Sequence, residues 1–119
     1  MDNNEKEIIP NSNIKEVSTE TFMQEVIEAS KEKPILVDFW APWCSPCLQI
    51  SPVLEQISEE MKDVTIAKHN IDEELNVPTK FSVKGIPTMI FFVNGEQKAV
   101  KVGASNKADL VDFLTKNKI

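Results

Sequence analysis

The chain has 119 residues, enough for a single domain with a hydrophobic core of its own. Its 13 cationic side chains, all of them lysine, are outnumbered by 19 carboxylates, and the net charge is −6. This charge argues against nucleic acid as the main partner, because phosphate binding requires a basic surface and favours arginine. No apolar run is long enough to cross a membrane, so no membrane partner is expected.

Residues 1–13 are polar and acidic, and we interpret them as a flexible leader in front of a domain that spans residues 14–119. The leader has neither the basic start and apolar segment of a secretory signal nor the arginines of a mitochondrial transit peptide. Two cysteines, three positions apart, are too few for a secreted disulfide scaffold. We therefore expect a cytoplasmic protein, in which a close cysteine pair is more often catalytic or metal-binding than structural.

The first half of the domain alternates strand and helix patterns. Residues 14–17 predict a short strand, and Ser18 or Thr19 can cap the helix that follows. Apolar side chains recur in this helix at spacings of four and three until about Ser30. Residues 35–41 then form a nearly continuous apolar run between two prolines, which is typical of a strand buried on both faces.

A second helix follows the cysteines. Its apolar residues are spaced four, three and four positions apart: Ile50, Leu54, Ile57 and Met61. Pro52 lies inside this pattern and is expected to kink the helix, because proline lacks a backbone donor. Residues 64–71 are rich in β-branched and apolar side chains and predict a third strand. Within residues 72–83 we expect a short helix that ends near Phe81.

The C-terminal third predicts a hairpin and a last helix. Residues 88–93 and 97–102 predict two strands, and Asn94-Gly95 between them favours a type I′ turn, which needs positive φ at both central residues. Asn106 can cap the final helix, whose inner face is Leu110, Phe113 and Leu114. The order β-α-β-α-β-α-β-β-α predicts an α/β fold with a mixed five-stranded central sheet flanked on both faces by four helices.

The two cysteines are the strongest chemical signal in the sequence. If Cys44 lies at the N-terminus of the second helix, the helix dipole and the free N–H groups stabilise its thiolate. Cys47 then lies one helical turn away, close enough to bond with Cys44, and Pro46 suits a first turn, where a missing N–H costs nothing. This arrangement predicts a two-step exchange, in which Cys44 attacks a substrate disulfide and Cys47 resolves the mixed disulfide.

Other roles for the pair fit the sequence less well. A zinc site needs four protein ligands, and the chain offers three, Cys44, Cys47 and His69, so no metal is expected. A purely structural disulfide across so short a loop would constrain the unfolded chain little. Two incidental reduced thiols remain an alternative, which the neighbouring Trp43 and Pro46 disfavour.

Four blocks of sequence stand in a known order and spacing: VDFWAPWCSPC, NIDEE, GIPTMIFFVNGE and KVGAS. In these blocks the chain resembles the thioredoxin family, and the likeness runs from about residue 14 to residue 117. The four blocks together are far more specific than the cysteine motif alone. The resemblance implies a thioredoxin fold and a thiol-disulfide oxidoreductase.

The resemblance also implies roles for residues in and beneath the cysteine motif. Cys44 resembles the exposed attacking thiol, and Cys47 resembles the buried resolving thiol with which it forms a disulfide. Asp38 resembles a buried acid that takes the proton from Cys47, and its apolar strand would by itself raise the pKa of the carboxyl group. Lys68 resembles a lysine that pairs with this acid, although a solvated strand lysine is an alternative.

A substrate-binding surface is implied as well. Pro87 resembles a cis-proline that faces the cysteines and presents the backbone of Ile86 to an extended substrate. The flat apolar surface around the cysteines would comprise Trp43, Gly85, Ile86, Pro87, Gly103 and Ala104. Trp40, in contrast, is expected in the core.

Three positions depart from the usual family pattern. Ser45 stands between the cysteines where glycine is usual, and with Pro46 and Lys68 it is expected to tune the redox reaction. Leu48 replaces a common lysine, which should leave the attacking thiol less acidic. Ser82 replaces a common glycine. These changes leave the reduction potential open, but not the reaction class.

By resemblance, the chain is a bacterial redox carrier that reduces protein disulfides in the cytoplasm and is recharged by a thioredoxin reductase. NADPH and FAD would belong to that reductase, and no cofactor is expected on this chain, which has no glycine-rich phosphate loop. Expected clients are ribonucleotide reductase, peroxiredoxins and methionine sulfoxide reductases, and the expected state is a monomer. The alternatives are a thiol oxidase or isomerase and a non-catalytic docking subunit whose thiols are incidental.

Overall fold

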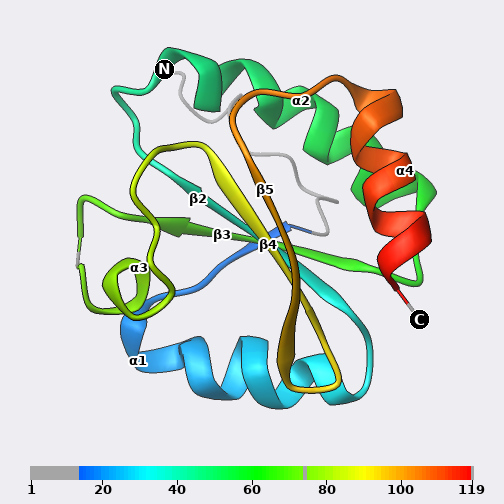
Figure 1. The fold of residues 1–119 in the computed structure, drawn as a ribbon, viewed down its shortest axis with the longest axis horizontal. Helices are drawn as coiled ribbons and strands as arrows, with labels where there is room; N and C mark the ends of the chain where they lie inside the picture. Colours follow the sequence, from blue (N-terminus) through cyan, green and yellow to red (C-terminus); the bar gives the residue numbers. More distant parts are fainter. Residues whose placement is uncertain (1–13, 74, 119) are drawn as a thin grey trace, which may run out of the picture.

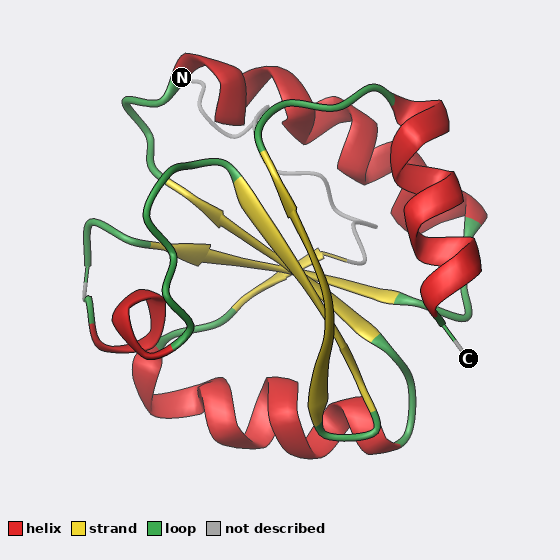
Figure 2. Cartoon of the chain, in the orientation of Figure 1, coloured by secondary structure: helices red, strands yellow, loops and turns green. Residues whose placement is uncertain are grey.

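The computed structural model describes residues 14–73 and 75–118. Their five strands form one sheet in the order β1-β3-β2-β4-β5, and helices cover both of its faces (Figures 1 and 2). The predicted α/β fold with a mixed sheet is therefore confirmed, and its elements follow the predicted order. The predicted leader, residues 1–13, lies outside the described residues.

The chain enters the sheet through β1 (Ile14–Glu16) and continues into a helical segment capped by Ser18. The Ser18 hydroxyl accepts the Thr21 N–H at 3.2 Å, and the Thr21 hydroxyl accepts the Ser18 N–H at 3.0 Å. The segment changes pitch along its length, in three parts: α1 (Thr19–Phe22), the π-helix η2 (Met23–Glu28) and the 3₁₀-helix η3 (Ala29–Lys31). The apolar spacing thus predicted the helix but not its changes of pitch.

The other elements lie within a few residues of their predicted positions. They are β2 (Ile35–Trp40), α2 (Ser45–Glu60), β3 (Thr65–Asn70), α3 (Asn76–Lys80), β4 (Thr88–Val93), β5 (Glu96–Val102) and α4 (Lys107–Asn117). Helix α2 continues through Pro52. Asn106 caps α4 as predicted, because its side-chain oxygen accepts the backbone N–H of Asp109 at 2.8 Å.

The sheet combines parallel and antiparallel pairs. Strands β1, β3 and β2 are parallel, whereas β4 is antiparallel to both β2 and β5. The predicted hairpin turn is confirmed, since φ is 57° at Asn94 and 85° at Gly95. Ser30, near the end of the first helical segment, holds this turn: its carbonyl accepts the Asn94 N–H at 3.0 Å and its hydroxyl accepts the Gly95 N–H at 2.8 Å.

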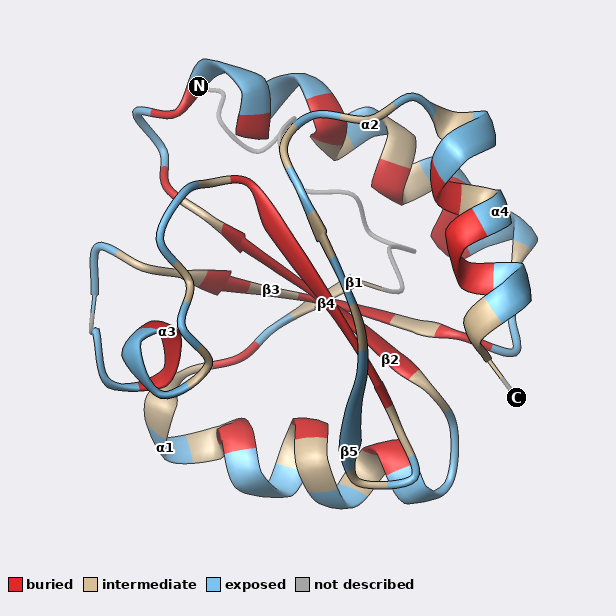
Figure 3. Ribbon diagram, viewed as in Figure 1, coloured by how far each residue is buried: buried red, intermediate tan, exposed pale blue. Residues whose placement is uncertain are grey.

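Two hydrophobic layers lie on opposite faces of the sheet. Helices α2 and α4 cover one face, while the first helical segment and α3 cover the other (Figure 1). The most deeply buried residues follow β2 and β4 through the centre of the molecule (Figure 3). Successive side chains of β2 alternate between faces, so Leu36 belongs to the α2 layer and Val37 to the opposite one. Asp38 and Trp40 therefore share the face that lies beneath α2.

Candidate active site

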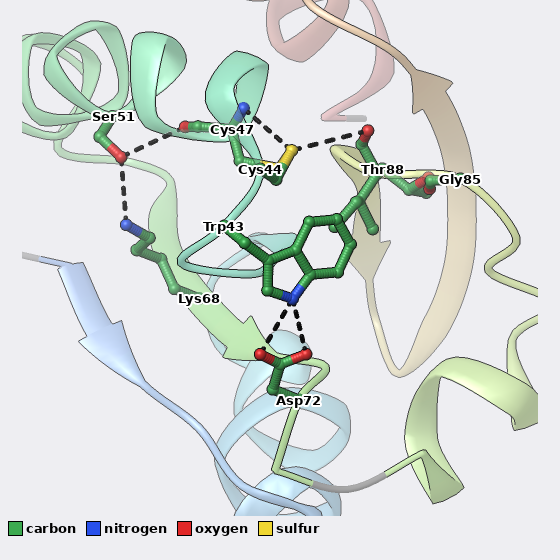
Figure 4. Close-up of a disulfide and its surroundings, with 9 residues drawn as sticks. Trp43, Cys44, Cys47, Ser51, Lys68, Asp72, Gly85 and Thr88 are labelled. Carbon is green, nitrogen blue, oxygen red and sulfur yellow. Dashed lines mark hydrogen bonds between the residues drawn. A yellow bond between two sulfur atoms is a disulfide. The ribbon is translucent and has the colours of Figure 1, made fainter.

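The cysteine pair lies where the chain passes from β2 into α2. Cys44 is the N-cap residue of α2, and the backbone N–H of Cys47 donates to the Cys44 sulfur at 3.2 Å. The two sulfurs form a disulfide, and the two Cα atoms are 5.2 Å apart (Figure 4). Ser45 and Pro46 are exposed in the first turn between them. The predicted placement of the pair at a helix N-terminus is confirmed.

The two cysteines differ in exposure. The side chain of Cys44 is 6% exposed and that of Cys47 is 1% exposed. The expectation of an openly exposed Cys44 is wrong for this disulfide-bonded state, because the other sulfur and the loop before β4 cover it. The Cys44 Sγ lies 3.9 Å from the carbonyl oxygen of Ile86 in that loop. Cys44 is still the more accessible of the two sulfurs.

The loop before β4 carries the cis-proline that the resemblance implied. The Ile86–Pro87 peptide bond is cis. Gly85 is exposed, Ile86 is partly exposed, and Pro87 is buried. The Gly103 N–H donates to the Pro87 carbonyl at 2.8 Å, which brings the turn after β5, with the exposed Ala104, next to this loop. The structure thus gathers the predicted substrate-binding residues of both loops on one side of the molecule.

Trp43 is the large exposed side chain beside the cysteines, and 66% of its surface is accessible. Its Nε1–H donates to both carboxylate oxygens of Asp72, each at 3.0 Å (Figure 4). This bond fixes the indole at the surface, where an apolar partner can contact it. Sequence analysis missed Asp72 as a site residue. Only its place in the NIDEE block, directly after β3, could have indicated it.

Asp38 belongs to a row of charged residues that crosses three strands beneath α2. In the sheet register, Lys68 of β3 is paired with Glu16 of β1 and with Asp38 of β2. Asp38 is fully buried, and neither of its carboxylate oxygens accepts a hydrogen bond from any described residue. Burial raises the pKa of Asp38 to about 7, against a smaller lowering by Lys68 and with a further small rise from Glu16. The predicted rise of this pKa is confirmed.

The expected pairing of Lys68 with Asp38 is wrong as a direct contact. The Lys68 ammonium instead donates to the Ser51 hydroxyl at 3.2 Å and lies 4.3 Å from the centre of the Trp40 ring (Figure 4). An ammonium keeps part of its hydration over an aromatic face, whereas contact with a buried carboxylate would strip it of water. Trp40 itself is half-buried and packs against the cysteines, so the prediction that it lies in the core is confirmed only in part.

The three departures from the family pattern occupy distinct environments. Ser45 is exposed in the first turn of α2. Leu48 is 49% exposed one residue after Cys47, so an apolar side chain stands in solvent beside the disulfide. Ser82 follows α3 with a φ of 59°, in the left-handed region that favours glycine.

The comparison with known families decides what these features mean together. The family model described as thioredoxin matches residues 13–116. The chain belongs to the thioredoxin family. It is 48% identical to a thioredoxin of Acidithiobacillus ferridurans over 82% of this chain and 90% of the relative. It is 43% identical to a thioredoxin of Rickettsia felis, over 85% of this chain and 95% of the relative. A thioredoxin of Pseudomonas aeruginosa is 42% identical, over 85% and 93% of the two chains.

Family membership and the bonded cysteine pair together define the activity. The chain is a thiol-disulfide oxidoreductase of the thioredoxin family, with protein-disulfide reductase activity. The family implies a thioredoxin reductase and disulfide-bearing proteins as partners in general. Across residues 14–73 and 75–118, the helices are all too short or too polar to span a membrane. Over the same ranges, His, Cys, Asp and Glu side chains form no group of three that could hold a metal ion.

Proposed function

We propose that Cys44 is the nucleophile and Cys47 the resolving thiol of the disulfide reductase reaction. The position of Cys44 carries this proposal: it caps α2, it is the more accessible cysteine, and the Cys47 N–H points at its sulfur. In the reduced protein, that N–H and the N-terminus of α2 stabilise a thiolate on Cys44.

The reaction moves two electrons from the cysteine pair to the substrate. The Cys44 thiolate attacks one sulfur of the substrate disulfide, forms a mixed disulfide and releases the other sulfur as a thiolate, which takes a proton from solvent. Cys47 loses its proton and attacks the Cys44 sulfur. This second attack releases the remaining substrate sulfur as a thiolate, which takes a proton from solvent, and leaves the disulfide between Cys44 and Cys47.

Asp38 is the group that we assign to the Cys47 proton. It lies on the strand beneath α2, and a pKa of about 7 suits proton transfer in both directions at neutral pH. The ionised carboxylate accepts the proton when Cys47 attacks. When a reductant later attacks the protein disulfide at Cys44, the protonated carboxyl group returns a proton to the departing Cys47 sulfur.

The substrate-binding surface is formed by Trp43 and by the loops of Ile86 and Gly103. The exposed indole offers apolar contact, and the backbone beside the cis-proline offers hydrogen bonds to an extended peptide. Both lie next to the Cys44 sulfur, which supports binding of a polypeptide disulfide rather than a small thiol. Ser45 and Pro46, exposed in the first turn, set the surroundings of the attacking sulfur.

The partners and the setting are part of the proposal, and membership of the thioredoxin family supports them. A thioredoxin reductase recharges the chain with electrons from NADPH through FAD, and both cofactors stay on the reductase. Ribonucleotide reductase, peroxiredoxins and methionine sulfoxide reductases are the proposed clients. The proposed working form is a cytoplasmic monomer.

Cysteine variants test the assignment of the two sulfurs. Incubated with a disulfide-bearing peptide, Cys47→Ser should accumulate a mixed disulfide at Cys44, detectable by mass, because no second thiol can release the substrate. Cys44→Ser should accumulate little, since its remaining thiol is buried. Trapping mainly through Cys47 would reverse the assignment.

The reduction potential tests the direction of the reaction. It is measured by equilibrating the protein with dithiol buffers and following tryptophan fluorescence. A value at or below the cytosolic glutathione poise, about −220 to −320 mV, supports a reductant. A clearly more oxidising value would instead support an oxidase or isomerase. Retention of a cellular role by the Cys44→Ser, Cys47→Ser double variant would support a docking subunit.

A further inference from the structure

Lys68 makes two contacts, and both hold its ammonium away from the buried acid. Its backbone is the direct register neighbour of Asp38, on the same face of the sheet. Its Nζ nevertheless lies 3.2 Å from the Ser51 hydroxyl and 4.3 Å from the centre of the Trp40 ring, and it forms no ion pair with Asp38. The Lys68 ammonium is therefore directed toward α2 and not toward the Asp38 carboxylate.

Ser51 is placed to make this contact one turn after the resolving cysteine. Its hydroxyl donates its one proton to the Cys47 carbonyl at 3.4 Å, the residue four positions earlier in α2. A hydroxyl whose proton is used in this way presents lone pairs in its other directions, and the Lys68 ammonium can only donate. In this contact Lys68 therefore donates and the Ser51 oxygen accepts. The hydrogen bond joins α2 to β3 over the row of charged residues.

The charges that face Asp38 are few. Lys68 on β3 lowers the pKa of the carboxyl group, and Glu16, beyond Lys68 on β1, raises it slightly. The pKa of Glu16 is itself raised by partial burial, and Lys68, Glu73 and His69 act on it more weakly. The residue of α2 that bonds to this row is the uncharged Ser51, and the register neighbour of Asp38 on β4 is Met89. Among residues 14–73 and 75–118, Lys68 is thus the one cation that lowers the pKa of Asp38, and the position of its ammonium decides how strongly the carboxylate is stabilised.

We propose that Ser51 is a positioning residue: it holds the Lys68 ammonium away from Asp38 and thereby sets the pH at which this carboxyl group exchanges its proton with Cys47. The inference rests on the proposed role of Asp38 as the proton acceptor. An ammonium in contact would keep Asp38 ionised, so the carboxyl group could not return a proton to Cys47 when the disulfide is reduced. An ammonium held at Ser51 leaves both protonation states of Asp38 accessible.

The test is the titration of Asp38 in the full-length oxidised protein, followed by ¹³C NMR of labelled aspartate carboxyl groups. The Asp38→Asn variant identifies the resonance by its loss. In Ser51→Ala the ammonium loses its acceptor and can approach Asp38, so the titration midpoint should fall by roughly one pH unit. Ser51→Thr keeps a hydroxyl at the same position and should restore the wild-type midpoint.

Two further comparisons separate positioning from a general structural effect. Ser58 also donates its hydroxyl to a carbonyl of α2, that of Glu55 at 2.8 Å, but near the other end of the helix. Ser58→Ala should therefore leave the Asp38 midpoint unchanged. On a Lys68→Gln background, Ser51→Ala should lose its effect, because no ammonium remains to be repositioned.

The pH profile of disulfide reduction provides the matching functional readout. The pre-reduced protein is mixed with insulin, and the rate of disulfide reduction is measured between pH 5 and 9. The midpoint of the Ser51→Ala profile should move in the same direction as the carboxyl titration. Equal midpoints for wild type and Ser51→Ala, or an equal shift on the Lys68→Gln background, would overturn the positioning role. Failure of the wild-type protein to reduce insulin would instead overturn the proposed function.

Discussion

At the scale of single residues, Ser82 carries a backbone conformation that its side chain does not favour. Its φ of 59° follows the last turn of α3, a position where a helix commonly ends on a left-handed glycine. Its side chain is exposed, so the backbone angle, and not side-chain packing, determines which residue type is favoured at this position. A glycine at this position would adopt the angle freely, whereas the serine side chain carries a steric cost there.

Ser82→Gly should stabilise the protein. The gain is expected to be about 0.5–1 kcal/mol, since relief of the left-handed strain exceeds the entropy that glycine adds to the unfolded chain. Urea unfolding of the oxidised protein measures the difference. Ser105→Gly is the matched control, because the φ of Ser105 itself is not positive and the same exchange should lower stability slightly. Equal effects of the two exchanges would contradict the argument.

At the scale of elements, the N-terminal half of α2 carries no charged side chain. Its exposed residues around the disulfide are uncharged, and the first acidic residue of the helix is Glu55. The thiolate of a reduced Cys44 is therefore stabilised by the helix dipole and by backbone N–H groups, with no cation on the helix to assist them. Leu48, half-exposed beside Cys47, is the position where a cation would act most directly.

Leu48→Lys should make the Cys44 thiol more acidic. The midpoint of thiolate absorbance in the reduced protein is expected to fall by a few tenths of a pH unit, a small change because solvent screens an exposed charge. Gln56→Lys adds the same charge in the C-terminal half of α2 and should leave the midpoint nearly unchanged. If Leu48→Lys and wild type gave the same midpoint, the missing cation would have no part in tuning the site.

At the scale of the whole molecule, the buried Asp38 links folding to pH. Unfolded, the carboxyl group has its ordinary pKa of 3.8, whereas in the folded protein burial raises the pKa to about 7. The folded state binds the proton more tightly, so the stabilising contribution is complete below pH 4 and is lost as pH rises to 7. A shift of this size corresponds to about 4 kcal/mol at most.

Urea unfolding of wild type and Asp38→Asn between pH 4 and pH 8 tests this link. The asparagine has no charge to bury, so the variant should gain stability relative to wild type as pH rises through this range. The difference between the two proteins removes the contribution of other titrating groups. A difference that does not change with pH would show that the carboxyl group titrates normally in the folded protein.

Whether a feature could be predicted from the sequence depends on how far apart in the chain its interacting residues lie. The hairpin at Asn94-Gly95 and the cap at Asn106 rest on signals from adjacent residues, and both were found from sequence. The contacts of Trp43 with Asp72 and of Lys68 with Ser51 join residues 29 and 17 positions apart. Such contacts depend on how strands and helices are stacked and on where a long side chain turns. The family resemblance therefore implied a pair between Lys68 and Asp38, with a solvated lysine as the alternative, and the structure shows no direct contact between the two side chains.

The anchoring of the hairpin by Ser30 has a consequence for hydrogen exchange. The amide protons of Asn94 and Gly95 lie at a hairpin tip, where exchange with solvent is normally fast, yet both are bonded to Ser30. These amide protons can exchange only when the hairpin separates from the first helical segment. Ser30, which bonds to them, is 65 positions before Gly95 in the chain. The tip should therefore exchange together with that segment as one cooperative unit, and not as a fraying end.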